Sequence, residues 1–173
     1  MSSIVTALPP HAPLTPAEGR APTPGALASH ARFVAARPGL WRQLERFTRP
    51  ERHWARLERT GTYEVWLLTW LPGQGTEIHG HGGSSGAFCV VRGELTERAF
   101  PPRGGTGAAR PWRLGTGAVR GFGPRHVHRV TNEGGTPATS IHVYAPSLAT
   151  MSYYEQTADG RLVEVRTEQE AGA

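Results

Sequence analysis

The sequence has a single cysteine, Cys89, and no run of about 18 apolar residues, the length that spans a membrane. One cysteine excludes an intramolecular disulfide, so nothing in the chain calls for an oxidising compartment. The N-terminus also lacks a basic region followed by an apolar stretch, so the sequence predicts neither a membrane span nor a secretory signal. We therefore expect a cytoplasmic protein with no membrane partner.

Clustered charge of one sign is also missing. The net charge is +5 and the pI is about 10.3, but the 19 basic residues are all arginines and are spread along the chain without a run. A protein that binds nucleic acid would gather them into a stripe or carry a recognisable motif. We therefore expect no nucleic-acid partner, and we expect a monomer.

Glycine and proline, by contrast, are abundant, at 22 and 15 residues, which favours short strands joined by turns. Residues 1–24 are rich in Pro, Ala, Ser and Thr, and this composition predicts a disordered leader. Within residues 25–50, apolar residues lie close to helical spacing and are interrupted by Pro38-Gly39. This pattern predicts two short N-terminal α-helices.

From about residue 51 the pattern changes to that of strands. Segments rich in β-branched and aromatic residues alternate with glycine-rich turns and cover residues 63–71, 87–91, 95–100, 112–114, 118–122, 127–131 and 139–145. Many short strands at regular spacing are typical of a sandwich or small barrel. We predict one all-β domain over residues 25–165, with its barrel at 51–165, and a frayed tail at 166–173.

Two histidines, His79 and His81, stand one residue apart in the glycine-rich stretch 73–86. Residues two apart in a strand face the same side, so both rings would project together, as two neighbouring metal ligands do. A second H-x-H pair, His126 and His128, follows later in the chain. A third imidazole from this second pair could complete one face of a metal site.

The spacing around both pairs resembles the two metal motifs of the cupin superfamily, over about residues 60 to 146. The first motif is matched by Gly73-x5-His79-x-His81-x4-Gly86-x6-Gly93, except that cupins commonly carry Glu at the position of Gly86. The second motif is similar to Pro124 followed by His128-x3-Asn132. The resemblance implies a small cupin β-barrel of the jelly-roll type.

Within that superfamily, the chain resembles the bacterial cysteine dioxygenase type I family, the arginine type of thiol dioxygenase. This family has an H-x-H pair without the cupin Glu, a third histidine in H-R-V-x-N and a strand that reads S-x-H-x-Y. Here the last two motifs read His128-Arg-Val-Thr-Asn132 and Ser140-Ile-His142-Val-Tyr144. The resemblance implies an Fe(II) site made by His79, His81 and His128.

The same resemblance implies roles for residues beyond the metal ligands. Ser140, His142 and Tyr144 alternate onto one strand face and would form a catalytic relay of hydroxyl, imidazole and phenol. The family also places an arginine within Y-x-R before its first long strand, and this chain has Trp54-Ala-Arg56 there. Arg56 would hold the substrate carboxylate with its planar fork, beside Tyr144 and Trp54.

Gly86 is a position at which the family divides. Eukaryotic members have a cysteine there that is cross-linked to the active-site tyrosine, whereas bacterial members have glycine. Tyr144 is therefore expected to be unmodified, and Cys89 to be a buried packing residue. The Ala145–Pro146 bond is expected to be cis, as it often is in the family.

The reaction that the resemblance implies is the oxidation of L-cysteine by O2 to cysteine sulfinic acid. Three alternatives stay open. His126 is the rival of His128 as third ligand, although the spacing to Asn132 favours His128. The substrate could be 3-mercaptopropionate, although enzymes of that type usually carry Gln at the position of Arg56. The chain could also be a metal-binding cupin without catalysis, such as a small-molecule sensor.

Overall fold

The structure is a computed structural model, and it describes residue 14 and residues 21–101 and 110–169. The predicted leader lies almost wholly outside the described residues, as do residues 170–173 of the predicted tail. Within the described part, the chain forms one α-helix, two short 3-10 helices and eleven strands. No helix in that part is both long and apolar enough to span a bilayer.

The single α-helix, α1 (Pro24–Ala35), begins where the side chain of Thr23 accepts a hydrogen bond from the backbone N–H of Ala26 at 3.2 Å. Proline suits the first helical position because its missing N–H would have no partner there. After α1 the chain makes only η2 (Pro38–Leu40) and η3 (Arg42–Leu44). The second predicted helix is therefore two single turns, since the proline that opens η2 cannot continue an α-helical ladder.

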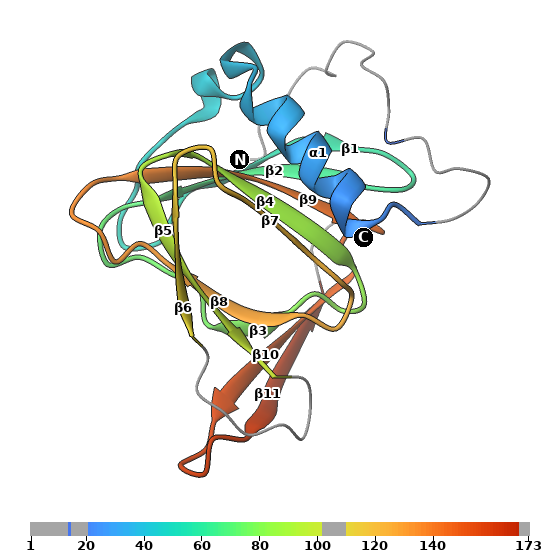
Figure 1. The fold of residues 1–173 in the computed structure, drawn as a ribbon, viewed down its shortest axis with the longest axis vertical. Coiled ribbons are helices and arrows are strands. Elements are labelled where there is room, and N and C mark those ends of the chain that lie inside the picture. Colours follow the sequence, from blue (N-terminus) through green and yellow to red (C-terminus); the bar gives the residue numbers. More distant parts are fainter. Residues whose placement is uncertain (1–13, 15–20, 102–109, 170–173) are drawn as a thin grey trace.

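The strands form two antiparallel sheets (Figure 1). The five-stranded sheet has the order β1-β2-β9-β4-β7, and the six-stranded sheet has the order β11-β10-β3-β8-β5-β6. In chain order the strands are β1 (Trp54–Arg59), β2 (Glu64–Trp70), β3 (Ile78–Gly80), β4 (Ser85–Arg92), β5 (Glu94–Phe100), β6 (Pro111–Gly115), β7 (Val119–Phe122), β8 (Val127–Thr131), β9 (Ala138–Ala145), β10 (Thr150–Gln156) and β11 (Leu162–Gln169). The all-β prediction is confirmed.

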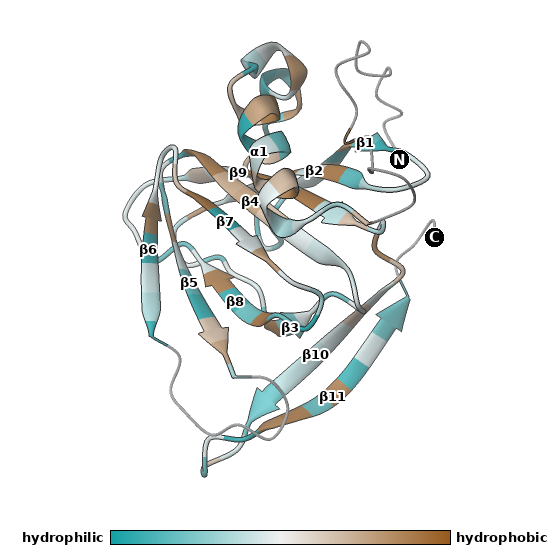
Figure 2. Cartoon of the chain, turned by 45° about the vertical axis from the view of Figure 1, so that its right-hand side comes forward, coloured by the Kyte–Doolittle hydropathy of each residue, from teal (hydrophilic) through white to brown (hydrophobic). Residues whose placement is uncertain are grey.

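The strands β10 and β11 form a hairpin that extends away from the rest of the barrel (Figure 1). The sequence pattern does not predict this hairpin, because β11 is exposed along most of its length and so lacks an alternation of buried and exposed residues. Residues 166–169, which we expected to be frayed, belong to β11. Figure 2 shows mainly hydrophilic or neutral residues along β10.

Two apolar clusters lie on opposite faces of the five-stranded sheet. One packs α1 against the outer face of the sheet and includes Leu27, Val34 and the buried Cys89. The other lies between the two sheets and includes Trp70 and Phe88. Strand β9 is buried along its whole length between them.

The alternation of β9 divides its side chains between these two clusters. Ile141 and Val143 belong to the cluster under α1, so the residues between and beside them face the inside of the barrel. Ser140, His142 and Tyr144 are those inward residues, and all three are buried. The fold therefore brings the S-x-H-x-Y motif to the barrel interior.

Candidate active site

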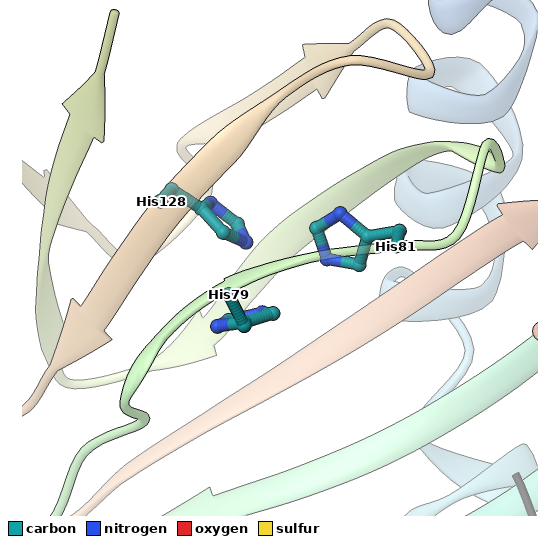
Figure 3. A group of neighbouring side chains, drawn as sticks. All are labelled: His79, His81 and His128. Carbon is teal, nitrogen blue, oxygen red and sulfur yellow. The ribbon is translucent and has the colours of Figure 1, made fainter. Parts of the chain in front are cut away.

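Three histidines meet inside the barrel. His79 lies on β3, His81 directly follows β3, and His128 lies on β8, where it pairs with His79 across the antiparallel ladder. One ring nitrogen of each lies within 4.8 Å of the others, and Figure 3 shows the three rings turned toward one another. All three side chains are buried. The structure thus forms a cluster that could hold a metal ion, from the three residues expected to do so.

The hydrogen bonds of the cluster fit a metal ion. Nδ1 of His79 lies 3.0 Å from the carbonyl oxygen of Glu77, and Nδ1 of His128 lies 2.8 Å from Oε1 of Glu97. Each Nδ1–H therefore donates outward, and Nε2 is left as the metal-binding nitrogen. Neither ring nitrogen of the buried His81 has a partner among the described residues. A bound cation would supply the partner that this imidazole lacks.

The surroundings also keep these imidazoles neutral, the form that binds metal. Burial lowers the pKa of His79 and of His81 well below the usual histidine value, and neighbouring histidines lower the pKa of both further. Burial likewise lowers the pKa of His128, although its hydrogen bond to Glu97 acts in the opposite direction. The ligands therefore need not lose a proton before a metal binds near neutral pH.

A chain of hydrogen bonds runs along the inner face of β9. Nε1–H of Trp70 donates to Oγ of Ser140 at 2.9 Å, and this hydroxyl lies 2.8 Å from Nε2 of His142. Nδ1 of His142 in turn lies 3.2 Å from the hydroxyl of Tyr144. Since Trp70 can only donate, the simplest order has Ser140 donate to Nε2 and His142 donate to the phenol oxygen.

His142 acts in this relay as a neutral ring. Burial, with a smaller effect of His128, lowers the pKa of His142 to about 3. The imidazole is then one donor and one acceptor, which suits its place between a hydroxyl and a phenol. The relay fixes the ring of Tyr144, whose O–H can act as a hydrogen-bond donor.

Beside the cluster lies a cavity of about 240 Å³. Its lining includes His79 and His128 of the cluster, together with His142 and Tyr144 of the relay. The other lining residues are mainly aromatic or apolar: Arg52, Trp54, Trp66, Leu68, Trp70, Thr76, Val130, Leu148, Met151 and Tyr153. The metal cluster and the relay therefore open onto one common space.

The predicted carboxylate clamp, Arg56, does not line this cavity. Its guanidinium is 4.0 Å from the buried carboxylate of Glu64 and lies over the ring of Trp66. The cationic side chain in the cavity lining is instead Arg52, which donates from Nη1 to the carbonyl oxygen of Gly75 at 2.9 Å. Its Nε is buried and has no partner among the described residues.

The structure also places the remaining residues that the sequence analysis singled out. Trp54 lines the cavity with 59% of its surface exposed, and its ring meets that of Trp66 edge to face at 5.3 Å. His126 precedes β8, and its Nε2 lies 3.0 Å from Glu97. The group that joins His79 and His81 contains His128 and not His126. The Ala145–Pro146 bond is cis.

The sequence matches the model of the family described as Cysteine dioxygenase type I over residues 29–157, which is more than half of the chain. The chain belongs to the cysteine dioxygenase type I family. Among curated proteins, none matches the chain.

Solved structures similar to this cysteine dioxygenase family member show the same fold. TT1209 from Thermus thermophilus is 24% identical, with a TM-score of 0.53 over 61% of this chain and 93% of that one. An uncharacterized conserved protein with a double-stranded β-helix domain from Klebsiella pneumoniae is 19% identical, with a TM-score of 0.52 over 72% of this chain and 93% of that one. These similarities confirm the predicted cupin barrel as the fold, and they carry no information on the activity.

Gly86, where eukaryotic cysteine dioxygenases carry cysteine, has no room for a side chain. A Cβ built there would lie 2.5 Å from Cζ of Phe122 and 2.9 Å from Cδ1 of Tyr144. Both rings also pack against His81, with centroids 4.9 Å and 5.2 Å from that of the imidazole. The bare backbone of β4 thus lets two aromatic rings press against a predicted ligand of this cysteine dioxygenase family member.

Sequence reasoning did not identify several of the residues around this site, four of which line or support the cavity. Trp70 anchors the relay, Arg52 brings a cation into the cavity, and Met151 and Tyr153 reach it from β10. The alternation of Arg52 with Trp54 and Arg56 is the one signal that could have suggested the second arginine. Nothing in the sequence pattern marks Met151 or Tyr153, because their strand is not predicted.

The neutral, buried histidines give this cysteine dioxygenase family member a predictable pH dependence. Burial lowers the pKa of His142 to about 3 in the folded protein, whereas the pKa of a histidine in the unfolded chain is about 6.5. Below that value the unfolded chain binds more protons than the folded one, so the free energy of unfolding falls as the pH falls.

Urea unfolding of the metal-free protein at about pH 7.5 and about pH 5.5 checks this expectation. We expect a loss of about 1.4 kcal/mol at the lower pH for each histidine that stays neutral when folded. The loss should be smaller in His142→Gln. Equal stability at both pH values would contradict the burial of neutral imidazoles.

Proposed function

We propose that the protein is an iron(II)-dependent dioxygenase that converts L-cysteine and O2 to cysteine sulfinic acid. One observation carries this proposal: three buried imidazoles converge beside a cavity that is also lined by a half-buried arginine and by Tyr144. A small thiol with a carboxylate could bind here with its sulfur at the imidazole cluster and its carboxylate at the arginine. Its operation as a monomer in the cytoplasm stays a prediction.

His79, His81 and His128 would hold the iron through neutral nitrogen atoms. Imidazole ligands suit Fe(II), and three of them on one side leave the other side open. Because no carboxylate of the described residues joins these three, the site would keep the full charge of the cation, which favours an anionic thiolate. Iron, when bound, would supply the place at which thiolate and O2 meet.

Arg52 would bind the substrate carboxylate. Its Nη1 donates to the carbonyl oxygen of Gly75, and its buried Nε has no hydrogen-bond partner among the described residues. The guanidinium therefore still has a donor that a substrate could use. The described residues that line the cavity include no Asp or Glu that would compete for it. A carboxylate could accept charge-assisted hydrogen bonds from this fork.

Tyr144, which lines the same cavity, would orient the substrate. Its hydroxyl is held by His142, which is in turn fixed by Ser140 and Trp70. A phenol restrained in this way can donate a hydrogen bond in one direction, and it loses little conformational entropy when the substrate binds. The relay would thus align the thiol substrate for oxidation.

The proposed reaction needs no further reductant. Both atoms of O2 form bonds to the thiolate sulfur, so the sulfur is oxidised by as many electrons as O2 takes up. No bond within the carbon skeleton breaks. The residues of the cavity therefore have to bind, orient and exclude water, and they need not transfer electrons from elsewhere.

A second candidate substrate is 3-mercaptopropionate. This thiol has the carboxylate of cysteine without the amine, and no acidic residue is found among the described residues of the cavity lining. The protein side chains would therefore recognise the carboxylate and leave the amine to the metal. The thiol preference then depends on whether the amine binds the iron.

Oxygen uptake with cysteine, 3-mercaptopropionate and cysteamine, together with mass detection of the sulfinate, tests the proposal. We expect cysteine to be oxidised, and cysteamine, which lacks the carboxylate, to be a poor substrate. Arg52→Met should raise the KM for cysteine by about 10–100-fold and change that for cysteamine little, since it removes a charge-assisted contact.

Arg56→Met is the matched comparison. If Arg52 is the clamp, this variant should keep a KM for cysteine close to that of the wild type. A rise in KM confined to Arg56→Met would return the clamp to Arg56. No sulfinate from any of the three thiols, with iron bound, would refute the proposed function.

A further inference from the structure

A buried carboxylate lies directly behind the metal cluster. Glu97 is on β5, and only 1% of its surface is exposed. Its Oε1 accepts from Nδ1 of His128 at 2.8 Å and from Nε2 of His126 at 3.0 Å. Its Oε2 accepts from Nε of Arg120 at 2.7 Å. Three donors therefore converge on one side chain that is not itself one of the three predicted metal ligands.

We propose that Glu97 is a positioning residue, which holds His128 in the tautomer that presents Nε2 to the metal. This inference rests on the metal site of the proposed function. Histidine ligands commonly donate their second ring N–H to a carboxylate, and such a partner fixes the ring and increases its strength as a ligand. Of the three predicted ligands, His128 has a charged partner of this kind, whereas His79 uses a backbone carbonyl.

The sheet geometry explains why Glu97 meets His128. In the ladder between β5 and β8, Ala99 is directly opposite His128. Glu97 is two residues from Ala99 on β5, so its side chain is on the same face and diagonally adjacent to the imidazole. The contact thus follows from the register of two paired strands and does not depend on a loop.

The opposite side of the carboxylate is tied to the other sheet. Arg120 lies on β7 of the five-stranded sheet, and its guanidinium stacks over the ring of Trp112 with 3.7 Å to the centroid. His126 stacks on Phe122, with ring centroids 4.8 Å apart. The contacts of Glu97 with Arg120, His126 and His128 are all with nitrogen atoms that can donate a hydrogen bond. These surroundings suit an ionised carboxylate, which only accepts.

The three donors explain why this position needs a carboxylate. An ionised carboxylate only accepts, whereas a carboxamide has one accepting oxygen and one donating nitrogen. In Glu97→Gln, an oxygen turned toward the histidines would direct the amide N–H groups at the donor of Arg120. An amide nitrogen turned toward the histidines would instead force Nδ1 of His128 to accept, which moves its proton to Nε2 and blocks the metal-binding nitrogen.

A competing interpretation is that Glu97, His126 and His128 hold a second metal, because their ligand atoms also lie within 4.8 Å of one another. The 2.8 Å and 3.0 Å contacts are already those of hydrogen bonds. A second metal would moreover need Nδ1 of His128 to lose its proton while Nε2 binds the first. The observed contacts therefore favour the positioning role.

Competition with a chelator measures the role through the affinity for Fe(II) and for Co(II) under anaerobic conditions, without any thiol. We expect Glu97→Gln to weaken both affinities by about 10–100-fold and to change the visible absorption of the Co(II) protein. Glu94→Gln is the matched control, because Glu94 lies on the same strand but is exposed and 4.0 Å from Arg113. It should bind both metals as the wild type does, and Glu97→Asp should recover part of the affinity.

Two results would overturn the proposal: wild-type affinity and an unchanged Co(II) spectrum in Glu97→Gln, or two Co(II) ions per wild-type chain. Long-range proton–nitrogen correlation spectra of the metal-free wild type give a test that needs no variant. They should show His128 protonated on Nδ1, and protonation on Nε2 would refute the inference. Because no thiol is used, a protein that binds metal but oxidises no thiol would refute the proposed function alone.

Discussion

Replacing His81 with alanine is expected to abolish metal binding and, with it, thiol oxidation. The two imidazoles that remain, His79 and His128, cannot form one side of a coordination sphere by themselves. The loss of affinity should exceed the roughly 10–100-fold that a partner outside the ligand set contributes. Metal analysis of the purified protein, with about one iron per chain expected in the wild type, measures the effect.

The same variant separates a ligand from a packing residue. Both ring nitrogens of His81 are buried without a partner among the described residues, which costs about 1–3 kcal/mol per unpaired group in the metal-free protein. His81→Ala removes that cost as well as the ring contacts, so the metal-free variant should stay folded. His53→Ala is the control, since His53 is half-buried and bonded to the carbonyl of Leu44. Full iron occupancy in His81→Ala would exclude the site.

Adding one carbon atom at Gly86 is expected to damage the site without touching a ligand. The new Cβ would meet Phe122 at 2.5 Å and Tyr144 at 2.9 Å, distances that real Cβ atoms do not reach. Both rings would have to shift, and both pack on His81. Overpacking of this kind costs about 1–3 kcal/mol. The rate of thiol oxidation should fall as well, because Tyr144 loses its place at the end of the relay.

Gly80→Ala provides a closely matched comparison. Gly80 lies between the two histidines of the first motif, yet a Cβ there would have Tyr154 as its nearest neighbour at 3.5 Å, an ordinary contact. Urea unfolding of both metal-free variants, with their activity measured when loaded, should show Gly86→Ala as the one that is impaired. Equal stability of the two variants would show that the packing around Gly86 is looser than this geometry requires.

The metal cluster and the relay could be predicted from the sequence because each depends on short-range periodicity. His79 and His81 are two apart, as are Ser140, His142 and Tyr144, and alternation along a strand is enough to bring each set to one face. The barrel determines how far the histidine cluster lies from the relay, and the motif spacing was enough to predict that barrel. The third ligand needed the spacing to Asn132 to distinguish it from His126.

Contacts between distant segments could not be predicted in this way. Glu97 meets His128 across 31 positions of sequence, through the register of β5 and β8. Arg52 precedes β1 and enters the cavity, whereas Arg56 on the strand turns to Glu64. A sequence pattern gives the face of a strand but not which side chain extends over a neighbouring strand, so it could not show that Arg52 lines the cavity.

The position of β3 has a consequence for the order in which the molecule is made. This strand has only three residues, and it is paired on one side with β8 and on the other with β10, where Tyr153 is opposite His79. A chain emerging from the ribosome therefore lacks one of these supports until the residues after 150 have appeared. The proposed metal site would therefore gain its full support only after β10 has been synthesised.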